Sequence, residues 1–112
     1  MSGIEGLDAL NKQLESLKGL TPKSMLAGAY TLMKYSMENA PVKTGFLKNS
    51  HSANETADGA EMVVSAGYAE FVEFGTSKWE GKPFVRPAID GHSDDIVKAV
   101  AEAIQEDIGG KM

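Results

Sequence analysis

Apolar residues recur at intervals of three and four near the N-terminus, with charged residues between them. They are Ile4, Leu7, Leu10, Leu14 and Leu17. This period predicts an amphipathic helix, which Gly19 ends. A second helix begins at Thr21 and Pro22, because threonine caps a helix start and proline fits its first turn. It should run to about Asn39, since Pro41 prevents continuation.

The second predicted helix has an apolar stripe that is rich in methionine. Its members are Met25, Leu26, Ala29, Met33, Met37 and Ala40. Methionine fills irregular gaps in a core, and it is also favoured on surfaces that adapt to a partner. Core filling is the preferred interpretation of these residues, and partner binding is the alternative.

The middle of the chain has the pattern of loops and strands. Residues 42–45 form a predicted loop, and residues 46–47 an apolar anchor. Residues 49–56 carry short polar side chains and give a weak strand signal, whereas residues 61–66 have a β-branched centre that is typical of a strand. Residues 58–59 are Asp-Gly, a common hairpin turn. We expect a β-hairpin here.

Residues 68–74 place aromatic and apolar side chains around one or two helical turns, which Gly75 would cap. Residues 76–82 follow as a polar loop that contains Trp79, the only tryptophan of the chain. Loops rich in glycine and lysine are usually exposed.

Helical spacing returns near the C-terminus, at Ile89, Ile96, Val100, Ala103, Ile104 and Ile108. This C-terminal helix should begin at Pro87 or Ser93 and end at residues 109–110, which are both glycine. The strand signals therefore lie between helices. We predict an α+β fold, in which a small antiparallel β-sheet packs with N-terminal helices and a C-terminal helix. The length of 112 residues favours one domain over residues 1–112.

Composition and charge argue against several kinds of binding and catalysis. The net charge of −5 opposes non-specific binding to DNA phosphates and to anionic lipid. Without cysteine there can be no disulfide, thiolate metal site or cysteine nucleophile. The N-terminus lacks a signal-peptide pattern, and no apolar run is long enough to span a bilayer. We expect a soluble protein that is made in the host cytoplasm and does not bind membranes.

No catalytic pattern emerges. A serine hydrolase would need a glycine-bounded nucleophile turn, which is missing. His51 and His92 lie in polar segments without a metal-ligand pattern and should be surface or turn histidines. Residues 94–95, both aspartate, suit the first turn of a helix, and residues 75–78 lack the leading glycine of a phosphate-binding loop. We expect no catalytic residues, cofactor or metal, and hence no enzyme.

Three segments carry a resemblance to a known family. They are Ala-Pro-Val-Lys-Thr-Gly-Phe-Leu-Lys-Asn-Ser at 40–50, Tyr-Ala-Glu-Phe-Val-Glu-Phe-Gly-Thr at 68–76 and Pro-Phe-Val-Arg-Pro-Ala at 83–88. In order and spacing they resemble the small neck proteins of siphophages, called head-tail joining, tail-completion or minor tail proteins. The likeness covers about residues 21–108.

The resemblance implies an α+β virion protein of a tailed phage or prophage, without enzymatic activity. Such a subunit forms a ring, expected to be hexameric, between the portal complex and the tail. Its partners would be copies of itself and other head-tail connector and tail proteins, with DNA only passing through the lumen. A tail terminator or another minor tail protein is the alternative, and a small hydrolase or nucleotide-binding module is a remote one.

Two sets of residues are singled out by the sequence: candidates for contacts between subunits, and a candidate ion pair that stabilises the fold. The interface candidates lie in the loops around residues 42–50 and 76–82, and they are Lys43, Thr44, Phe46, Lys78, Trp79 and Lys82. Arg86 lies in an apolar segment, where charges are normally paired, so we predict that it pairs with Glu73 or Glu70. Gly45 and Gly75 stand where the chain must reverse, which often requires positive φ.

Overall fold

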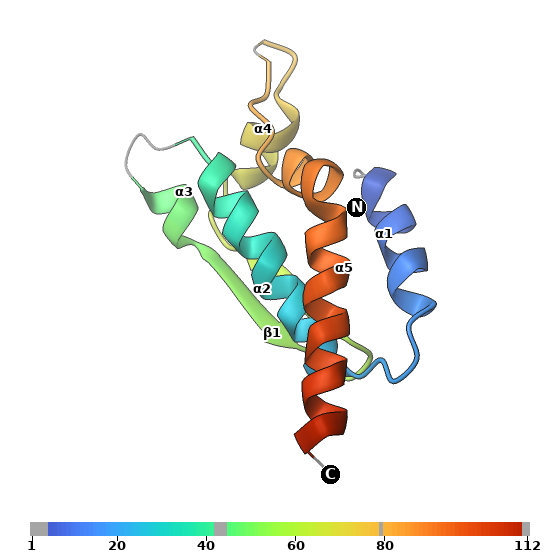
Figure 1. Ribbon diagram of the computed structural model, residues 1–112. Coiled ribbons are helices and arrows are strands. Elements are labelled where there is room, and N and C mark those ends of the chain that lie inside the picture. The colour runs from blue at the N-terminus through green and yellow to red at the C-terminus, as the bar shows by residue number, and fades with distance from the viewer. Residues whose placement is uncertain (1–4, 42–44, 79, 111–112) are drawn as a thin grey trace.

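The structure, a computed structural model, describes residues 5–41, 45–78 and 80–110. Its elements in chain order are α1 (Glu5–Glu15), α2 (Pro22–Asn39), α3 (Phe46–Asn49), β1 (His51–Glu55), β2 (Ala60–Val64), α4 (Ala69–Phe74) and α5 (Val85–Gly110). The two strands form one antiparallel sheet (Figure 1). The α+β class predicted from the sequence is confirmed.

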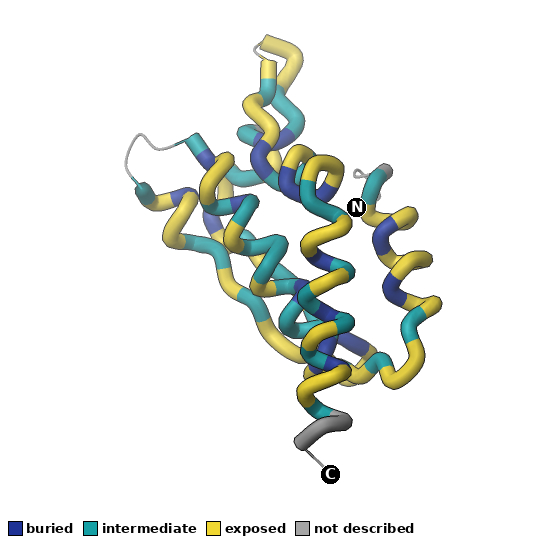
Figure 2. Tube along the Cα trace, in the orientation of Figure 1, coloured by how far each residue is buried: buried dark blue, intermediate teal, exposed yellow. Residues whose placement is uncertain are grey.

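Helix α2 lies at the centre of the molecule, between the hairpin and α5. It contacts both strands on one side and α5 on the other, and α1 packs against α5 (Figure 1). The main core joins α1 to α5 through Leu10, Leu14, Ile89, Ile96, Val100 and Ile104. A second cluster, at the end near α3 and α4, consists of Ala40, Leu47, Ala66 and Phe84. Figure 2 shows both groups as buried positions.

The start and end of α2 match the sequence prediction. The Thr21 hydroxyl accepts the N–H of Ser24 at 3.1 Å, and the Ser24 hydroxyl accepts the N–H of Thr21 at 2.9 Å. These reciprocal bonds satisfy donors that a helix start leaves free. Residue Ala40, after the last turn, is extended, as expected before Pro41.

Of the predicted apolar stripe of α2, Ala40 is buried but the other members are only partly buried, so the stripe does not mark the most buried face of the helix. That face carries small residues, Ser24, Gly28 and Ser36, whereas the methionines of α2 are only partly buried. Ser24 belongs to the cap and Ser36 hydrogen-bonds to His51 of β1, whereas for Gly28 the reason is close helix packing. A Cβ atom built on Gly28 would lie 2.7 Å from Cγ2 of Val100 in α5, too near for any side chain. Gly28 therefore lets α2 sit tightly against α5.

The hairpin forms as predicted, but its turn differs from the prediction. Glu55 faces Ala60, so the chain reverses one residue before the centre expected for an Asp-Gly turn, and Gly59 lacks the positive φ of such a turn. The strands are also shorter than the predicted ranges. In the register His51 faces Val64 at one end and Glu55 faces Ala60 at the other. At the turn, Thr56 N–H donates to Gly59 O at 2.9 Å. Its side chains alternate between a face toward α2 and an exposed outer face, as the period of two in a strand requires.

Two helix boundaries differ from the prediction. Helix α5 begins at Val85, before either Pro87 or Ser93, and is kinked at His92, where φ is −134° and ψ is 21°. Helix α1 ends at Glu15, and the chain turns before Gly19 at φ +84°. Among the described residues, none of the helices combines the length and the apolar character of a membrane-spanning segment.

Candidate assembly surface

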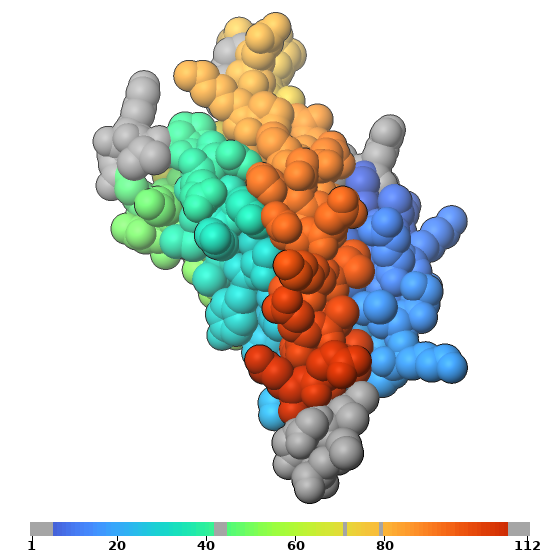
Figure 3. Space-filling view, in the orientation of Figure 1, coloured from blue at the N-terminus to red at the C-terminus, as the bar shows by residue number. Residues whose placement is uncertain are grey.

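The loop of residues 76–82 projects from the body of the molecule. It extends beyond α4, at the end opposite the C-terminus (Figures 1 and 3). Lys78 and Lys82, two predicted interface residues, are exposed on it. Trp79 lies outside the described residues. A charged loop held away from the core is suited to contact another subunit.

The two ends of this loop lie directly against each other. Gly75 adopts φ +79°, a left-handed conformation that favours glycine. A Cβ atom on Gly81 would lie 2.6 Å from the backbone nitrogen of Gly75, so only glycine permits this approach. Lys82 N–H donates to Val72 O at 2.7 Å. The base of the loop is therefore closed by backbone contacts.

Glu73, at the end of α4, joins that base to the start of α5. Its side chain is only 4% exposed. One carboxylate oxygen, Oε1, accepts the N–H groups of Phe84 at 2.9 Å and Val85 at 2.8 Å. The other, Oε2, accepts the N–H of Arg86 at 2.9 Å. The carboxylate thus caps α5, which explains why the helix begins before Pro87.

Arg86 completes this arrangement. Its Nε donates to Glu73 Oε2 at 3.1 Å, and its Nη2 donates to the Glu73 carbonyl at 2.7 Å. The guanidinium also lies 4.9 Å from the ring centroid of Phe74, within cation–π range. Of the two partners that the sequence allowed, the structure brings Glu73 to Arg86, while Glu70 is exposed.

The environment of Glu73 favours its charged form. Burial of the carboxyl opposes ionisation, but the N–H groups of Val85, Phe84 and Arg86 and the Arg86 side chain outweigh this cost. The pKa of Glu73 therefore lies below its ordinary value.

The second predicted contact region, residues 42–50, includes α3. Gly45 precedes this helix at φ +76°, as predicted. The expectation that residues 46–47 anchor the chain holds for Leu47, which is 3% exposed, but not for Phe46, which is 58% exposed. The ring centroid of Phe46 lies 6.1 Å from that of Tyr68, itself 42% exposed. Lys43 and Thr44 lie outside the described residues.

Residues 8–75 match the HK97-gp10-like family of bacteriophage proteins, described as candidate tail components. The match spans more than half of the chain, from α1 to the base of the projecting loop. The chain belongs to this family. The resemblance inferred from the sequence is confirmed at the level of a phage tail component, a virion protein that interacts with other phage proteins. No curated protein and no solved structure gives a significant match.

The two histidines of this tail component differ from the expectation of simple surface residues. His51 faces α2, with Nε2 2.7 Å from the Ser36 hydroxyl and Nδ1 3.0 Å from the Lys48 carbonyl. Its ring meets the edge of Phe84. It is a half-buried packing residue, because its position in β1 points it toward the helix layer.

His92 lies at the kink of α5. Its ring stacks on Tyr35 of α2 with 3.5 Å between the centroids. The Tyr35 hydroxyl donates to Asp95 Oδ2 at 2.9 Å, and His92 Nδ1 lies 3.6 Å from the same oxygen. The hydrogen bond from Tyr35 is the largest cause that lowers the pKa of Asp95. The sequence predicts residues 94–95 in the first turn of a helix, but α5 begins at Val85 and they lie just after its kink.

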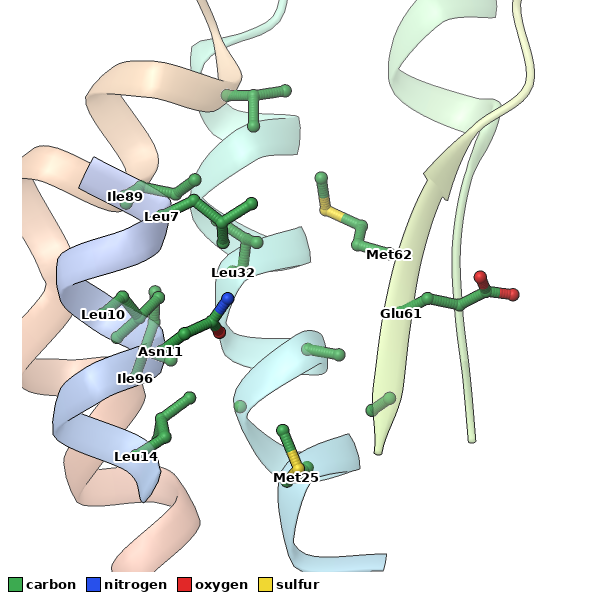
Figure 4. Close-up of a pocket in the computed structure, with 14 residues that line it drawn as sticks. Leu7, Leu10, Asn11, Leu14, Met25, Leu32, Glu61, Met62, Ile89 and Ile96 are labelled. Atoms are coloured by element: carbon green, nitrogen blue, oxygen red, sulfur yellow. The ribbon is translucent and has the colours of Figure 1, made fainter. Parts of the chain in front are cut away.

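An apolar hollow of about 390 Å³ lies between α1, α2 and β2 (Figure 4). Leucine and methionine side chains dominate its wall, including Leu7, Leu14, Leu32 and Met62. Glu61 points away from it, toward the other side of the strand (Figure 4). Within the described ranges, no group of three or more His, Asp or Glu side chains could hold a metal ion.

Proposed function

We propose that this tail component is a structural subunit of the ring that joins the phage head, on its portal side, to the tail. Six copies form the ring. The subunit acts by presenting surfaces to its own copies and to neighbouring connector and tail proteins, and it catalyses no reaction.

The projecting loop is the observation that carries this proposal. Residues 76–82 extend away from the core, yet their base is fixed by the contact between Gly75 and Gly81 and by the bonds of Glu73. A contact loop with a fixed base loses little conformational entropy when it binds, which favours affinity.

The chemistry of the described residues supports a non-enzymatic role. The buried carboxylate of Glu73 accepts four hydrogen bonds, from three backbone N–H groups and from Arg86 Nε. A general acid or base must instead be free to reach a substrate proton. The hollow beside α1 is lined mostly by apolar side chains, which offer no proton donor or acceptor.

The negative net charge of the subunit is compatible with a ring through which DNA passes. Each subunit has a net charge of −5, so six copies carry −30. A negative lumen offers phosphates no counter-charge, and passing DNA would not adhere to it.

Deletion of the gene in the phage or prophage tests this role. We expect filled heads and separate tails of normal length in electron micrographs, with joined particles restored when the wild-type gene is supplied in trans. A tail terminator would give a different result, since tails that are not stopped grow beyond their normal length. Joined particles of normal yield without the protein would contradict both roles.

A further inference from the structure

Among the residues that the structure describes, the outer edges of both strands of the hairpin have no backbone partners. Thr56 N–H bonds to Gly59 O at one end and Ser65 N–H bonds to Ser50 O at the other. Along an antiparallel ladder, residue pairs that exchange backbone hydrogen bonds alternate with pairs that do not. Between these two ends, the hydrogen-bonded pairs are therefore Asn54 with Glu61 and Ser52 with Val63. The residues between them therefore turn their N–H and C=O groups outward: His51, Ala53, Glu55, Ala60, Met62 and Val64.

Within the described part of the chain, these outward groups have no other use. Among the described residues, no backbone hydrogen bond outside the helices and the hairpin reaches any of the six. Helix α2 packs against both strands of the hairpin. Beyond Ala60 and Met62, the β2 edge borders the apolar hollow, with α1 on the far side (Figure 4).

Three features that often prevent strand pairing are absent from both edges, although each strand carries one glutamate, Glu55 or Glu61. Proteins protect exposed edges with lysine, proline or a bulge. The strands His-Ser-Ala-Asn-Glu and Ala-Glu-Met-Val-Val contain neither lysine nor proline, and their register is continuous. A two-stranded sheet is also marginal when alone, and a third strand would stabilise it.

We propose that β2 of one subunit pairs with β1 of the next, so that the hairpins of neighbouring copies form one continuous antiparallel sheet. The inference rests on the ring of the proposed function. The occupant is a second copy because the chain carries two different open edges, which together make a head-to-tail contact that a ring requires. Rotation about a ring axis keeps strand directions alternating, so β2 and the neighbouring β1 are antiparallel.

The register of the hairpin can continue across this contact. Met62 would then face Ala53 of the next subunit, flanked by the pairs of Ala60 with Glu55 and Val64 with His51. All three are pairs of outward-facing residues, and each exchanges two backbone hydrogen bonds. Glu61 would face Asn54, so no two carboxylates are directly opposite. Glu61 side chains of adjacent subunits would be two strands apart, roughly 10 Å.

Cysteine cross-linking tests the pairing, because the natural chain has no cysteine. Across the proposed contact Val63 and Ser52 form a non-bonded pair, with Cα atoms about 4.5 Å apart, which suits a disulfide. Both side chains are exposed on the outer face. The variants Ser52→Cys and Val63→Cys are supplied together during particle assembly, one with a mass tag, and the particles are oxidised.

A mixed disulfide dimer between the two variants supports the inference. Two results overturn the pairing but not the proposed ring. The first is particles that contain the protein but give no mixed dimer, and the second is dimers formed by either single variant alone. The register control combines Asn54→Cys with Val63→Cys. In the proposed register these two residues form a diagonal pair, about 7–8 Å apart, and should cross-link less. An equal yield of mixed dimer from this control would overturn the stated register. Particles that lack the protein altogether overturn the proposed function itself.

Proline substitution provides a second measurement. Ala53→Pro removes an outward N–H that the hairpin does not use, and edge strands tolerate proline there. The variant should keep its helical circular dichroism and assemble with an association constant at least about tenfold lower, a loss of about 1.4 kcal/mol. The matched variant Ser52→Pro removes an internal bond and should disturb the hairpin. A folded Ala53→Pro subunit that assembles like wild type overturns the pairing.

Discussion

A single carboxylate, that of Glu73, organises the junction between α4 and α5. It accepts the N–H groups of three successive residues, Phe84, Val85 and Arg86, and the Arg86 side chain. Since a buried carboxylate without partners would be costly, each of these bonds matters to stability.

Glu73→Gln tests this role. The amide keeps the shape of the side chain but loses the charge that Arg86 pairs with, and its NH₂ group cannot accept an N–H. We expect the free energy of unfolding, measured with urea at pH 7, to fall by about 1–3 kcal/mol. The exposed Glu70→Gln should change it by less than about 0.5 kcal/mol. Equal stability of Glu73→Gln and wild type would contradict the assignment.

The pH dependence of stability provides a separate test. The pKa of Glu73 in the folded protein lies below its ordinary value of 4.5, so the unfolded chain binds the proton first as the pH falls. The contribution of Glu73 is therefore complete above about pH 4.5 and is lost as the pH falls through the folded pKa. The difference in urea stability between wild type and Glu73→Gln should shrink between pH 7 and pH 3. A constant difference would be inconsistent with this linkage.

Helix α2 depends on a close contact with α5. Gly28 is buried, and its backbone faces Val100 and Ile96. Alanine is normally the better residue inside a helix, but here the added methyl group would overlap Val100.

Gly28→Ala should therefore lower the free energy of unfolding by about 1–3 kcal/mol, as overpacking does. The matched change is Gly91→Ala in α5, where an added Cβ meets no atom within 4 Å. That variant should be neutral or gain up to about 1 kcal/mol from helix propensity. Thermal unfolding of both variants measures these changes in stability. A Gly28→Ala variant more stable than wild type would show that α2 and α5 are not in tight contact.

The kink of α5 is accompanied by contacts with α2 through Tyr35. Tyr35→Phe removes the hydroxyl that donates to Asp95. The pKa of Asp95 is lowered chiefly by this bond, so it should rise toward its ordinary value in the variant. Carboxyl ¹³C shifts followed by NMR titration measure it. Tyr30→Phe, on an exposed tyrosine of the same helix, should leave the Asp95 titration unchanged; an identical effect of both variants would exclude the specific bond.

The whole molecule is elongated, 56 × 25 × 24 Å, and the 76–82 loop extends one end of it (Figure 1). A subunit of this shape can contact a neighbour through its side and another protein through its end. In our proposal the hairpin edges form the side contact with the neighbouring subunit. The 76–82 loop forms the end contact with another protein or adds to the side contact.

Trp79→Ala tests the loop. Trp79 stands between Lys78 and Glu80, and the prediction rests on its place in the sequence. Buried tryptophan is a frequent anchor of interfaces, so its loss should weaken assembly by about 30-fold, or about 2 kcal/mol, and leave the unfolding temperature unchanged. Trp79→Phe keeps an aromatic ring and should assemble better than Trp79→Ala. Unchanged ring formation and virion yield in Trp79→Ala would remove Trp79 as an anchor.

Local signals in the sequence were sufficient for most elements. Thr21 and Pro22 start α2 because capping depends on neighbouring residues alone, and Gly45 and Gly75 adopt positive φ because their side chains are absent. The α+β class followed from the order of these elements, and the need of Arg86 for a carboxylate partner followed from its apolar surroundings, although the sequence did not decide between Glu73 and Glu70.

Tertiary structure decided the features that depend on distant residues. The start of α5 at Val85 is set by Glu73, twelve residues earlier along the chain. The buried positions of α2 carry small residues because Gly28 lies against Val100 of α5 and Ser36 against His51 of β1, and no pattern within α2 reveals these contacts. His51 packs against Ser36, and Phe46 stays exposed while Leu47 is buried, because the fold brings only certain faces together. Burial is a property of the assembled layers, whereas caps and turns are properties of adjacent residues.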